Sequence, residues 1–142
     1  MAIQMNPYLN FDGTAEQAFN FYKSVFGGEF AAVMRFGDNP QCGEMADDDK
    51  QKIMHIALPI DNGMLMASDT VESMGKKVTQ GNNVSISLAP ETREDADRLF
   101  GGLSDGGKAE MAMTEMFWGY FGCFTDKFGV QWMLNVGNNQ SS

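Results

Sequence analysis

TEMFWGYFGCFTDKFGVQWMLN, residues 114–135, is the stretch of sequence that decides the fold. An aromatic strand comes first, and a glycine break at Gly119 separates it from a second strand. A turn at residues 125–129 then leads to a closing strand at 130–135. Three short strands with such brief connections predict the end of a β-rich unit.

The rest of the chain runs through the same order of elements twice. The first series is a predicted strand at 5–11, a helix that starts at Thr14, and strands at 29–36, 52–60 and 63–68. The second series is a strand at 83–89, a helix that starts at Thr92 and ends at Gly106-Gly107, and strands at 108–117, 120–125 and 130–135. Thr14 and Gln17 have the spacing of a capping box, and the long connection at 37–51 is either mobile or a lid.

This duplication predicts an α+β fold in a single domain, 1–142. It consists of a first βαβββ module at 5–69, a linker at 70–81 and a second βαβββ module at 82–136. Each helix covers one face of its sheet and leaves the other face free. We therefore expect the two free faces to curl into one shared cavity.

Composition excludes several classes of function. The 142 residues carry a formal net charge of −9, which disfavours nucleic acid and anionic membranes as partners. No signal segment starts the sequence and no apolar run is long enough to cross a bilayer, so we expect a cytoplasmic protein. Cys42 and Cys123 form no CxxC pattern and are expected to remain thiols.

Several motifs together resemble one known family. They are the opening PYLNFDGTAEQAFNFYKSVFGGEF, the central IMHIAL and GMLMASD, the E-x-FWG segment and the ending FTDKFGVQWMLN. In this order they resemble the PhnB-like branch of the vicinal oxygen chelate superfamily, which includes glyoxalase I, bleomycin-resistance proteins and extradiol dioxygenases. The resemblance implies an eight-stranded, incompletely closed barrel around a ligand cavity, a homodimer and a small-molecule ligand.

The resemblance also implies a metal site, which this sequence does not match. The superfamily usually holds its metal with one side chain from the first and one from the last strand of each module, positions that fall here at Asn6, Met66, Ser85 and Met133. An amide, a hydroxyl and two thioethers offer a divalent ion no charge. We therefore expect no cofactor of the family's kind. A divalent metal held by other ligands, drawn from His55, Glu115, Glu44 and Cys123, stays open.

His55 and Glu115 are the candidate catalytic residues. His55 is the only histidine, and an imidazole suits a general acid or base near neutral pH. Glu115 lies in an apolar, aromatic strand, where a buried carboxylate is costly unless it is paired. The alternatives are that His55 is a hydrogen-bonded structural residue and that Glu115 points to solvent. If both face inward, they form a pair for proton transfer.

Polar, aromatic and methionine side chains supply the candidate ligand-binding set. Trp132 and Leu134 are assigned to the core beneath the second helix, whereas alternate positions on the strands are assigned to the free faces. The predicted ligand-binding residues are Tyr8, Asn10, Met66, Ser85, Ser87, Trp118 and Met133.

Three functions follow from these features. The first is a small-molecule enzyme or binder of the PhnB-like type, whose site works without the family's usual metal. The second is a protein that sequesters a cationic drug, as bleomycin-resistance members do. The third is a metalloenzyme with non-family ligands. The substrate, and whether the protein is an enzyme, stay open.

Overall fold

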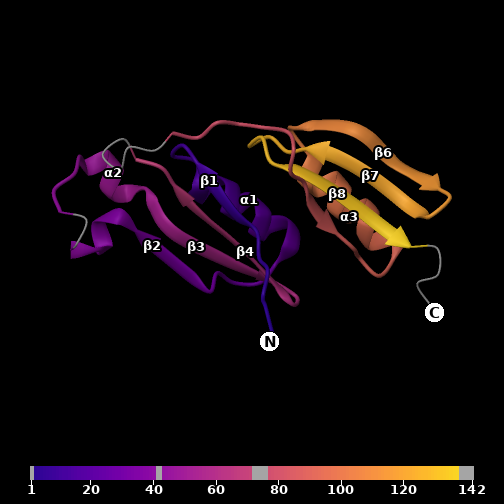
Figure 1. Ribbon diagram of the computed structural model, residues 1–142, viewed down its shortest axis with the longest axis horizontal. Coiled ribbons are helices and arrows are strands. Elements are labelled where there is room, and N and C mark those ends of the chain that lie inside the picture. Colours follow the sequence, from indigo (N-terminus) through magenta and orange to yellow (C-terminus); the bar gives the residue numbers. More distant parts are fainter. Residues whose placement is uncertain (1, 41–42, 72–76, 138–142) are drawn as a thin grey trace. The chain divides into compact units, whose positions relative to one another are not determined.

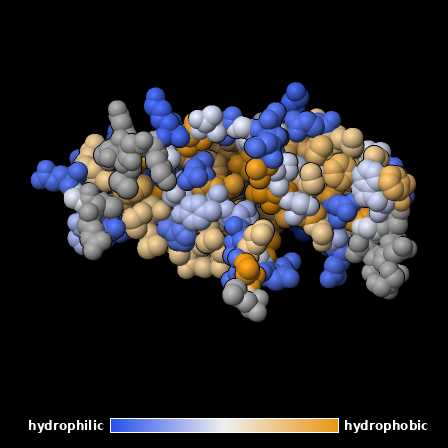
Figure 2. All heavy atoms as spheres, in the orientation of Figure 1, coloured by the Kyte–Doolittle hydropathy of each residue, from blue (hydrophilic) through white to orange (hydrophobic). Residues whose placement is uncertain are grey.

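The computed structural model describes residues 2–40, 43–71 and 77–137. The chain forms two compact units, Met1–Thr79 and Gln80–Ser142. Each unit contains one four-stranded sheet with a long helix against one of its faces (Figure 1). Strongly hydrophilic side chains project at several places along the outline in Figure 2, in keeping with the high content of acidic residues.

The first unit follows the predicted order of elements. It contains β1 (Tyr8–Phe11), α1 (Ala15–Phe26), β2 (Ala32–Arg35), β3 (Ile53–Ile60) and β4 (Gly63–Asp69). The strand order is β1-β4-β3-β2, and β1 runs parallel to β4 while the other pairs are antiparallel. The connection at 37–51 contains two short helical segments, η1 (Phe36–Asp38) and α2 (Asp47–Gln51). Three aspartates in the first turn of α2 stabilise its N-terminus.

The second unit repeats this arrangement. It contains β5 (Ile86–Leu88), α3 (Arg93–Ser104), β6 (Lys108–Met116), β7 (Gly119–Thr125) and β8 (Gln131–Gly137), in the strand order β5-β8-β7-β6. The first strand is again parallel to the last. The predicted α+β class, with eight strands in two βαβββ series, is confirmed.

The first strand of each unit is shorter than its hydrophobic pattern suggests. The predicted strand 5–11 becomes regular only at Tyr8, and the predicted strand 83–89 only at Ile86. Pro7 explains the first difference, because it has no N–H to donate to a neighbouring strand. Its carbonyl still accepts a hydrogen bond from the Met66 N–H, so the chain is held beside β4 before the strand begins.

The core of each unit lies between the sheet and its helix. In the first unit α1 buries Ala18, Phe19 and Tyr22. In the second unit α3 buries Ala96, Leu99 and Leu103, and the sheet buries Phe124, Trp132 and Leu134. The burial of Trp132 and Leu134 agrees with their assignment to the core. Among the described residues, no helix combines the length and the apolar character needed to cross a membrane.

The two long helices begin in different ways. Thr92 caps α3 as its sequence predicts, because its hydroxyl accepts a hydrogen bond from the Asp95 N–H at 3.1 Å. The capping box predicted at Thr14 and Gln17 is wrong, since the Thr14 side chain makes no cap hydrogen bond. A buried carboxylate from β4, distant in sequence, instead accepts a hydrogen bond from the first turn of α1.

Asp69 is this carboxylate, and only 4% of it is exposed. Its Oδ1 accepts a hydrogen bond from the Ala15 N–H at 2.9 Å, and its Oδ2 accepts one from the Ile53 N–H at 2.9 Å. Negative charge at a helix N-terminus is favourable because the first N–H groups have no partner within the helix. Asp69 thus joins the end of β4 to the starts of α1 and β3.

Asp126 has a similar part in the second unit, where it is 3% exposed. Its Oδ1 accepts hydrogen bonds from the N–H groups of Phe128 and Val130, and its Oδ2 accepts one from the indole Nε1 of Trp132. Gly129, with a φ of +88°, completes this turn. The predicted turn at 125–129 is therefore fixed by a carboxylate that also positions the largest core side chain.

We predict that Asp69→Asn lowers the free energy of unfolding by about 2 kcal/mol, because an amide cannot accept from both N–H groups and one of them stays buried without a partner. Urea unfolding at neutral pH measures this loss. Asp47→Asn is the control, since that carboxylate is fully exposed at the start of α2 and its loss should cost far less than the loss at Asp69. An equal, small effect of both substitutions would contradict the assigned role of Asp69.

An ion pair between Glu16 and Arg35 predicts a pH-dependent contribution to stability. The Arg35 guanidinium donates from Nη1 to Glu16 Oε1 at 3.0 Å and from Nη2 to Oε2 at 2.7 Å, which ties α1 to β2. These hydrogen bonds lower the pKa of Glu16, although partial burial opposes the shift. Because the folded-state pKa is depressed, the stabilisation is present above the ordinary glutamate pKa and is lost as the pH falls through the folded-state value.

Glu16→Gln should therefore reduce stability at neutral pH by about 0.5 kcal/mol, a modest loss because both side chains are partly exposed. The difference from the unmodified protein should vanish in acid, where both side chains are neutral. Urea unfolding across the pH range measures it. Glu29→Gln is the matched control, because Glu29 is 88% exposed and lies 3.4 Å from Lys23.

Candidate functional site

The first unit presents one sheet face that α1 does not cover. Strand alternation sends Leu9 and Phe11 toward the helix and Tyr8 and Asn10 to the other side. In register, Tyr8 lies opposite Met66, and Asn10 lies opposite Ser68. We call this side the helix-free face of the first unit.

His55 joins this face from β3. Ala57 pairs with Met66 in register, so His55, two residues earlier on the same strand, points to the same side. A bulge after Met34 interrupts the pairing between β2 and β3 beside it. The structure thus gathers His55, Tyr8, Asn10 and Met66, four predicted site residues, on one face.

A contact between Tyr8 and His55 is the central feature of this face. The Tyr8 hydroxyl and His55 Nδ1 are 3.1 Å apart and hydrogen bonded, and the two rings stack with centroids 5.7 Å apart and planes 27° from parallel. Because β4 lies between β1 and β3, the pair reaches across a strand. Tyr8 is 45% exposed, so a solute can reach this pair.

The hydrogen bond leaves the second ring nitrogen of His55 available. No residue in the described part of the chain is hydrogen bonded to Nε2. If Tyr8 donates to Nδ1, Nε2 carries the proton and is a donor; if Nδ1 donates to Tyr8, Nε2 is a base. With Nδ1–H donating to Tyr8, Nε2 can take a proton from a bound molecule, and the imidazolium so formed can return it.

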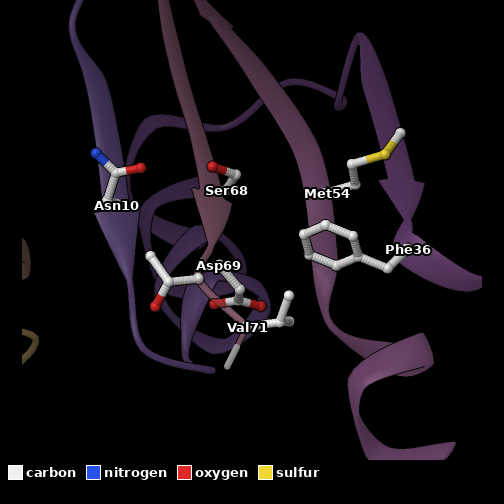
Figure 3. A pocket seen from close by; sticks show the side chains of 7 residues that line it. Asn10, Phe36, Met54, Ser68, Asp69 and Val71 are labelled. Carbon is white, nitrogen blue, oxygen red and sulfur yellow. The ribbon is translucent and has the colours of Figure 1, made fainter. Parts of the chain in front are cut away.

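A small cavity lies at one end of the same face, where β1 and β4 end. It has a volume of about 230 Å³, and its walls include Asn10, Ser68, Met54 and Phe36 (Figure 3). Asp69 and Val71 lie at its base in this view. Sequence reasoning identified Asn10 but missed Ser68, whose place opposite Asn10 depends on a parallel pairing of strands 58 residues apart in sequence.

The family's usual metal does not fit the residues present. The Asn6 side-chain oxygen accepts a hydrogen bond from the Met64 N–H at 3.1 Å, so it helps to hold the chain. In register, Met66 lies opposite Tyr8, not Asn6, and Met133 lies opposite Ser87, not Ser85. Neither first-and-last-strand pair supplies a carboxylate or an imidazole, the groups that divalent ions prefer.

The second unit also has a helix-free face. Ser87 and Met133 lie opposite each other on it, and Cys123 pairs with Met133 from β7. Ser85 is exposed and precedes β5. Trp118 is 42% exposed, and its ring packs edge to face against Phe117 and Phe121 at the β6–β7 turn.

Glu115 is paired with a cation from the second helix. It pairs with Tyr120 in register and forms an ion pair with Arg93 of α3, and its side chain is 61% exposed. Arg93 also lies over the Tyr120 ring, whose hydroxyl donates to Asp97 at 2.6 Å. This hydrogen bond raises the pKa of Tyr120, while Arg93 acts in the opposite direction.

Glu115 therefore points toward the helix-covered side and is mostly exposed, which agrees with the alternative that it faces solvent and not with the inward-facing pair. Strand alternation places it there, because its register partner Tyr120 lies opposite the buried Val136, and Arg93 of α3 pairs with it. Cys123 lies three residues beyond Tyr120 on β7, on the other face of the sheet, so Glu115 and Cys123 do not face one ion. No cluster of three or more His, Cys, Asp or Glu residues suited to a metal is found in the described ranges.

A family model described as 3-demethylubiquinone-9 3-methyltransferase matches residues 3–135. The chain belongs to this family. Protein YjdN from Escherichia coli K12 is 33% identical over 145 residues, which cover 96% of this chain and 97% of that protein.

Solved structures agree with the assignment. PA1353 from Pseudomonas aeruginosa is 40% identical, with a TM-score of 0.85 and coverage of 96% of this chain and 98% of that one. A Bacillus cereus protein described as a putative 3-demethylubiquinone-9 3-methyltransferase, PhnB protein, is 26% identical, with a TM-score of 0.76 and coverage of 95% and 100%. The resemblance to the PhnB-like branch is confirmed.

The wider superfamily is represented by its fold alone. A variant of the fosfomycin resistance protein FosX from Listeria monocytogenes, complexed with Mn(II) and a dihydroxypropylphosphonic acid, has a TM-score of 0.66 at 10% identity, with coverage of 99% and 97%. This likeness shows that the two chains share a fold.

We predict that Tyr8→Phe changes the ¹⁵N chemical shifts of both ring nitrogens of His55, because loss of the hydroxyl removes the group that selects the tautomer at Nδ1. NMR of the single histidine measures the change. Tyr120→Phe is the matched control, since it removes a hydroxyl that is bonded to Asp97 on the helix-covered side. Identical His55 spectra in the unmodified protein and Tyr8→Phe would contradict the hydrogen bond.

Proposed function

We propose that this PhnB-like protein binds a small organic molecule on the helix-free face of its first unit and transfers a proton to or from it at His55. The hydrogen bond between Tyr8 and His55 Nδ1 is the observation that carries the proposal. Tyr8 orients the imidazole, and Nε2 meets the ligand. Asn10 and Met66, beside the pair, supply a hydrogen-bonding group and an adaptable apolar surface.

The proposed site works without the family's usual metal. FosX, whose structure contains Mn(II), shares the fold, but the corresponding strands here offer Tyr8, Met66, Ser87 and Met133. A neutral phenol, a hydroxyl and thioethers do not offset the dehydration of a divalent ion. The proton donor and acceptor are therefore the chain's own side chains. Glu115 has no part in this proposal, because Arg93 is its partner.

The methyltransferase named in the family description is not extended to this chain. A methyl transfer needs a bound methyl donor, and the sequence has no glycine-rich loop between a strand and a helix of a parallel α/β arrangement for a nucleotide-like cofactor. Hydrogen-bonding groups around a half-buried imidazole favour proton transfer instead.

A second candidate is the sequestration of a cationic drug without reaction. The net charge of −9 and the exposed aromatic side chains Phe117 and Trp118 favour it, because cations bind both to acidic surfaces and to aromatic rings. We place it second because the Tyr8–His55 pair would then have no use.

We also propose a homodimer in the cytoplasm. Strand β6 is nine residues long, mostly exposed, and lies at the edge of its sheet, and such an edge favours pairing with another chain. Light scattering that gave a particle of 15.6 kDa at high concentration would exclude the dimer.

We predict that the protein retains a small molecule from a metabolite mixture and that His55→Gln and Tyr8→Phe retain about tenfold less, as expected for the loss of a hydrogen bond of about 1.4 kcal/mol. The proteins are separated from the mixture by gel filtration and the bound molecule is identified by mass spectrometry. Tyr120→Phe should retain as much as the unmodified protein.

Equal retention by all four proteins would contradict the proposal. Tight binding of a cationic glycopeptide by the unmodified protein and by His55→Gln alike, with no retained metabolite, would favour sequestration instead. Proton transfer is tested on the retained molecule in D₂O: the unmodified protein should exchange one of its C–H protons faster than His55→Gln, and unchanged exchange would reject that step.

A further inference from the structure

The cavity at the end of β1 and β4 has polar side chains on one side and apolar side chains on the other. In Figure 3, Asn10 and Ser68 lie on one side, and Phe36 and Met54 lie on the other, across the opening. Phe36 and Val71 are almost fully buried, at 6% and 1% exposure, so the apolar side is firmly packed. A ligand in this cavity would meet hydrogen-bonding groups on one flank and an aromatic ring and thioether on the other.

The two polar side chains are free to bind a ligand. Asn10 and Ser68 are neighbours in the parallel pairing of β1 with β4, and they make no side-chain hydrogen bond within the described residues. Asn10 offers both a donor and an acceptor, and Ser68 offers a hydroxyl that can do either. By contrast, the Met54 thioether already accepts a hydrogen bond from Asn39.

The charge at the cavity is negative. Asp69 lies in its wall, and both of its oxygens are held by backbone N–H groups. No lysine or arginine is among the described residues that line it, and Lys52, whose charge reaches Asp69, is paired with Asp49 at 3.0 Å. An anion entering here would meet a buried carboxylate and, among those lining residues, no cation, which is costly in a partly desolvated site.

We infer that this cavity binds an uncharged group that donates an N–H or O–H to Asn10 and Ser68 and places a compact apolar body against Phe36 and Met54, and that it rejects carboxylates and phosphonates. The inference rests on the proposed function, since Asn10 is two residues from Tyr8 on the same face. It specifies the class of ligand for that site.

The size of the cavity further limits the class of ligand that it can hold. Pockets for drug-sized ligands measure roughly 300–1,000 Å³, whereas this one measures about 230 Å³. It therefore accommodates a group about the size of one substituted ring, or one end of a longer molecule whose other end reaches His55. The ligand is accordingly a small alcohol or amide with a short apolar portion.

A series of probes with one ring and different head groups tests the inference. Benzamide, benzyl alcohol, benzoate and phenylphosphonate are titrated separately into the full-length ¹⁵N-labelled protein, and backbone NMR shifts report affinity and position. We expect benzamide and benzyl alcohol to shift residues 10, 36, 54, 68 and 71, with dissociation constants at least about tenfold lower than those of the two anions.

Substitutions of the lining residues test whether the probes bind in this cavity. Asn10→Ala and Ser68→Ala should each weaken benzamide about three- to tenfold, the range for loss of one hydrogen bond. Asn20→Ala, on the exposed side of α1, and Ser104→Ala, at the end of α3, are the matched controls and should leave the affinity unchanged. Urea unfolding of each variant separates a lost contact from a lost fold.

Two results would overturn the inference: phenylphosphonate or benzoate binding as tightly as benzamide, or no probe shifting the lining residues at millimolar concentration. If either result is obtained while retention of a metabolite still depends on Tyr8 and His55, the proposed function stands and only the role of this cavity is wrong. If Tyr8→Phe and His55→Gln both retain the metabolite as well as the unmodified protein does, while benzamide still binds at Asn10 and Ser68, the proposed function is rejected instead.

Discussion

The buried carboxylate of Asp69 is the constraint on which the first unit depends. It terminates β4, accepts from the first turn of α1 and accepts from the first N–H of β3, so three elements meet at one side chain. A carboxylate with so little exposure is stable only when its oxygens are hydrogen bonded. Its position therefore fixes where β1 and α1 lie relative to β4, and with them the helix-free face on which Tyr8, Asn10 and His55 gather.

The second unit meets the same requirement by another route. Asp126 closes the turn between β7 and β8 and accepts from the indole of Trp132, the largest fully buried side chain. The helix of this second unit, α3, is capped locally by Thr92, whereas α1 of the first unit relies on Asp69. The two βαβββ units thus share a topology but not the contacts that secure it. The topology follows from local sequence patterns and could be predicted. The capping of α1 depends on Asp69, which lies 54 residues from Ala15, and could not.

Periodicity carries information over a few residues, and it predicted well what depends on a few residues. The helices, the turn before Gly129 and the core position of Trp132 all follow from local pattern. Positions that depend on register did not follow. Ser68 faces Asn10, and Tyr8 instead of Asn6 faces Met66, because parallel pairing of β1 with β4 sets the alignment of segments 58 residues apart. The side on which Glu115 lies was left open for a related reason, since it depends on the register of β6 with β7, and its partner Arg93 comes from α3.

The candidate site combines uncharged polar side chains with one buried carboxylate, Asp69, whose oxygens both accept backbone hydrogen bonds. A helix-free face is exposed to solvent or to a ligand, so small polar residues such as Asn10 and Ser68 are tolerated there without partners. Charged groups of the first unit are instead committed to structure: Asp69 to backbone N–H groups, Glu16 to Arg35 and Asp49 to Lys52. On the described helix-free face, the imidazole of His55 is oriented by a phenol at 3.1 Å. An imidazole held in this way suits the proposed proton transfer, and the buried carboxylate of Asp69 in the cavity wall disfavours the anions that the inferred site is expected to reject.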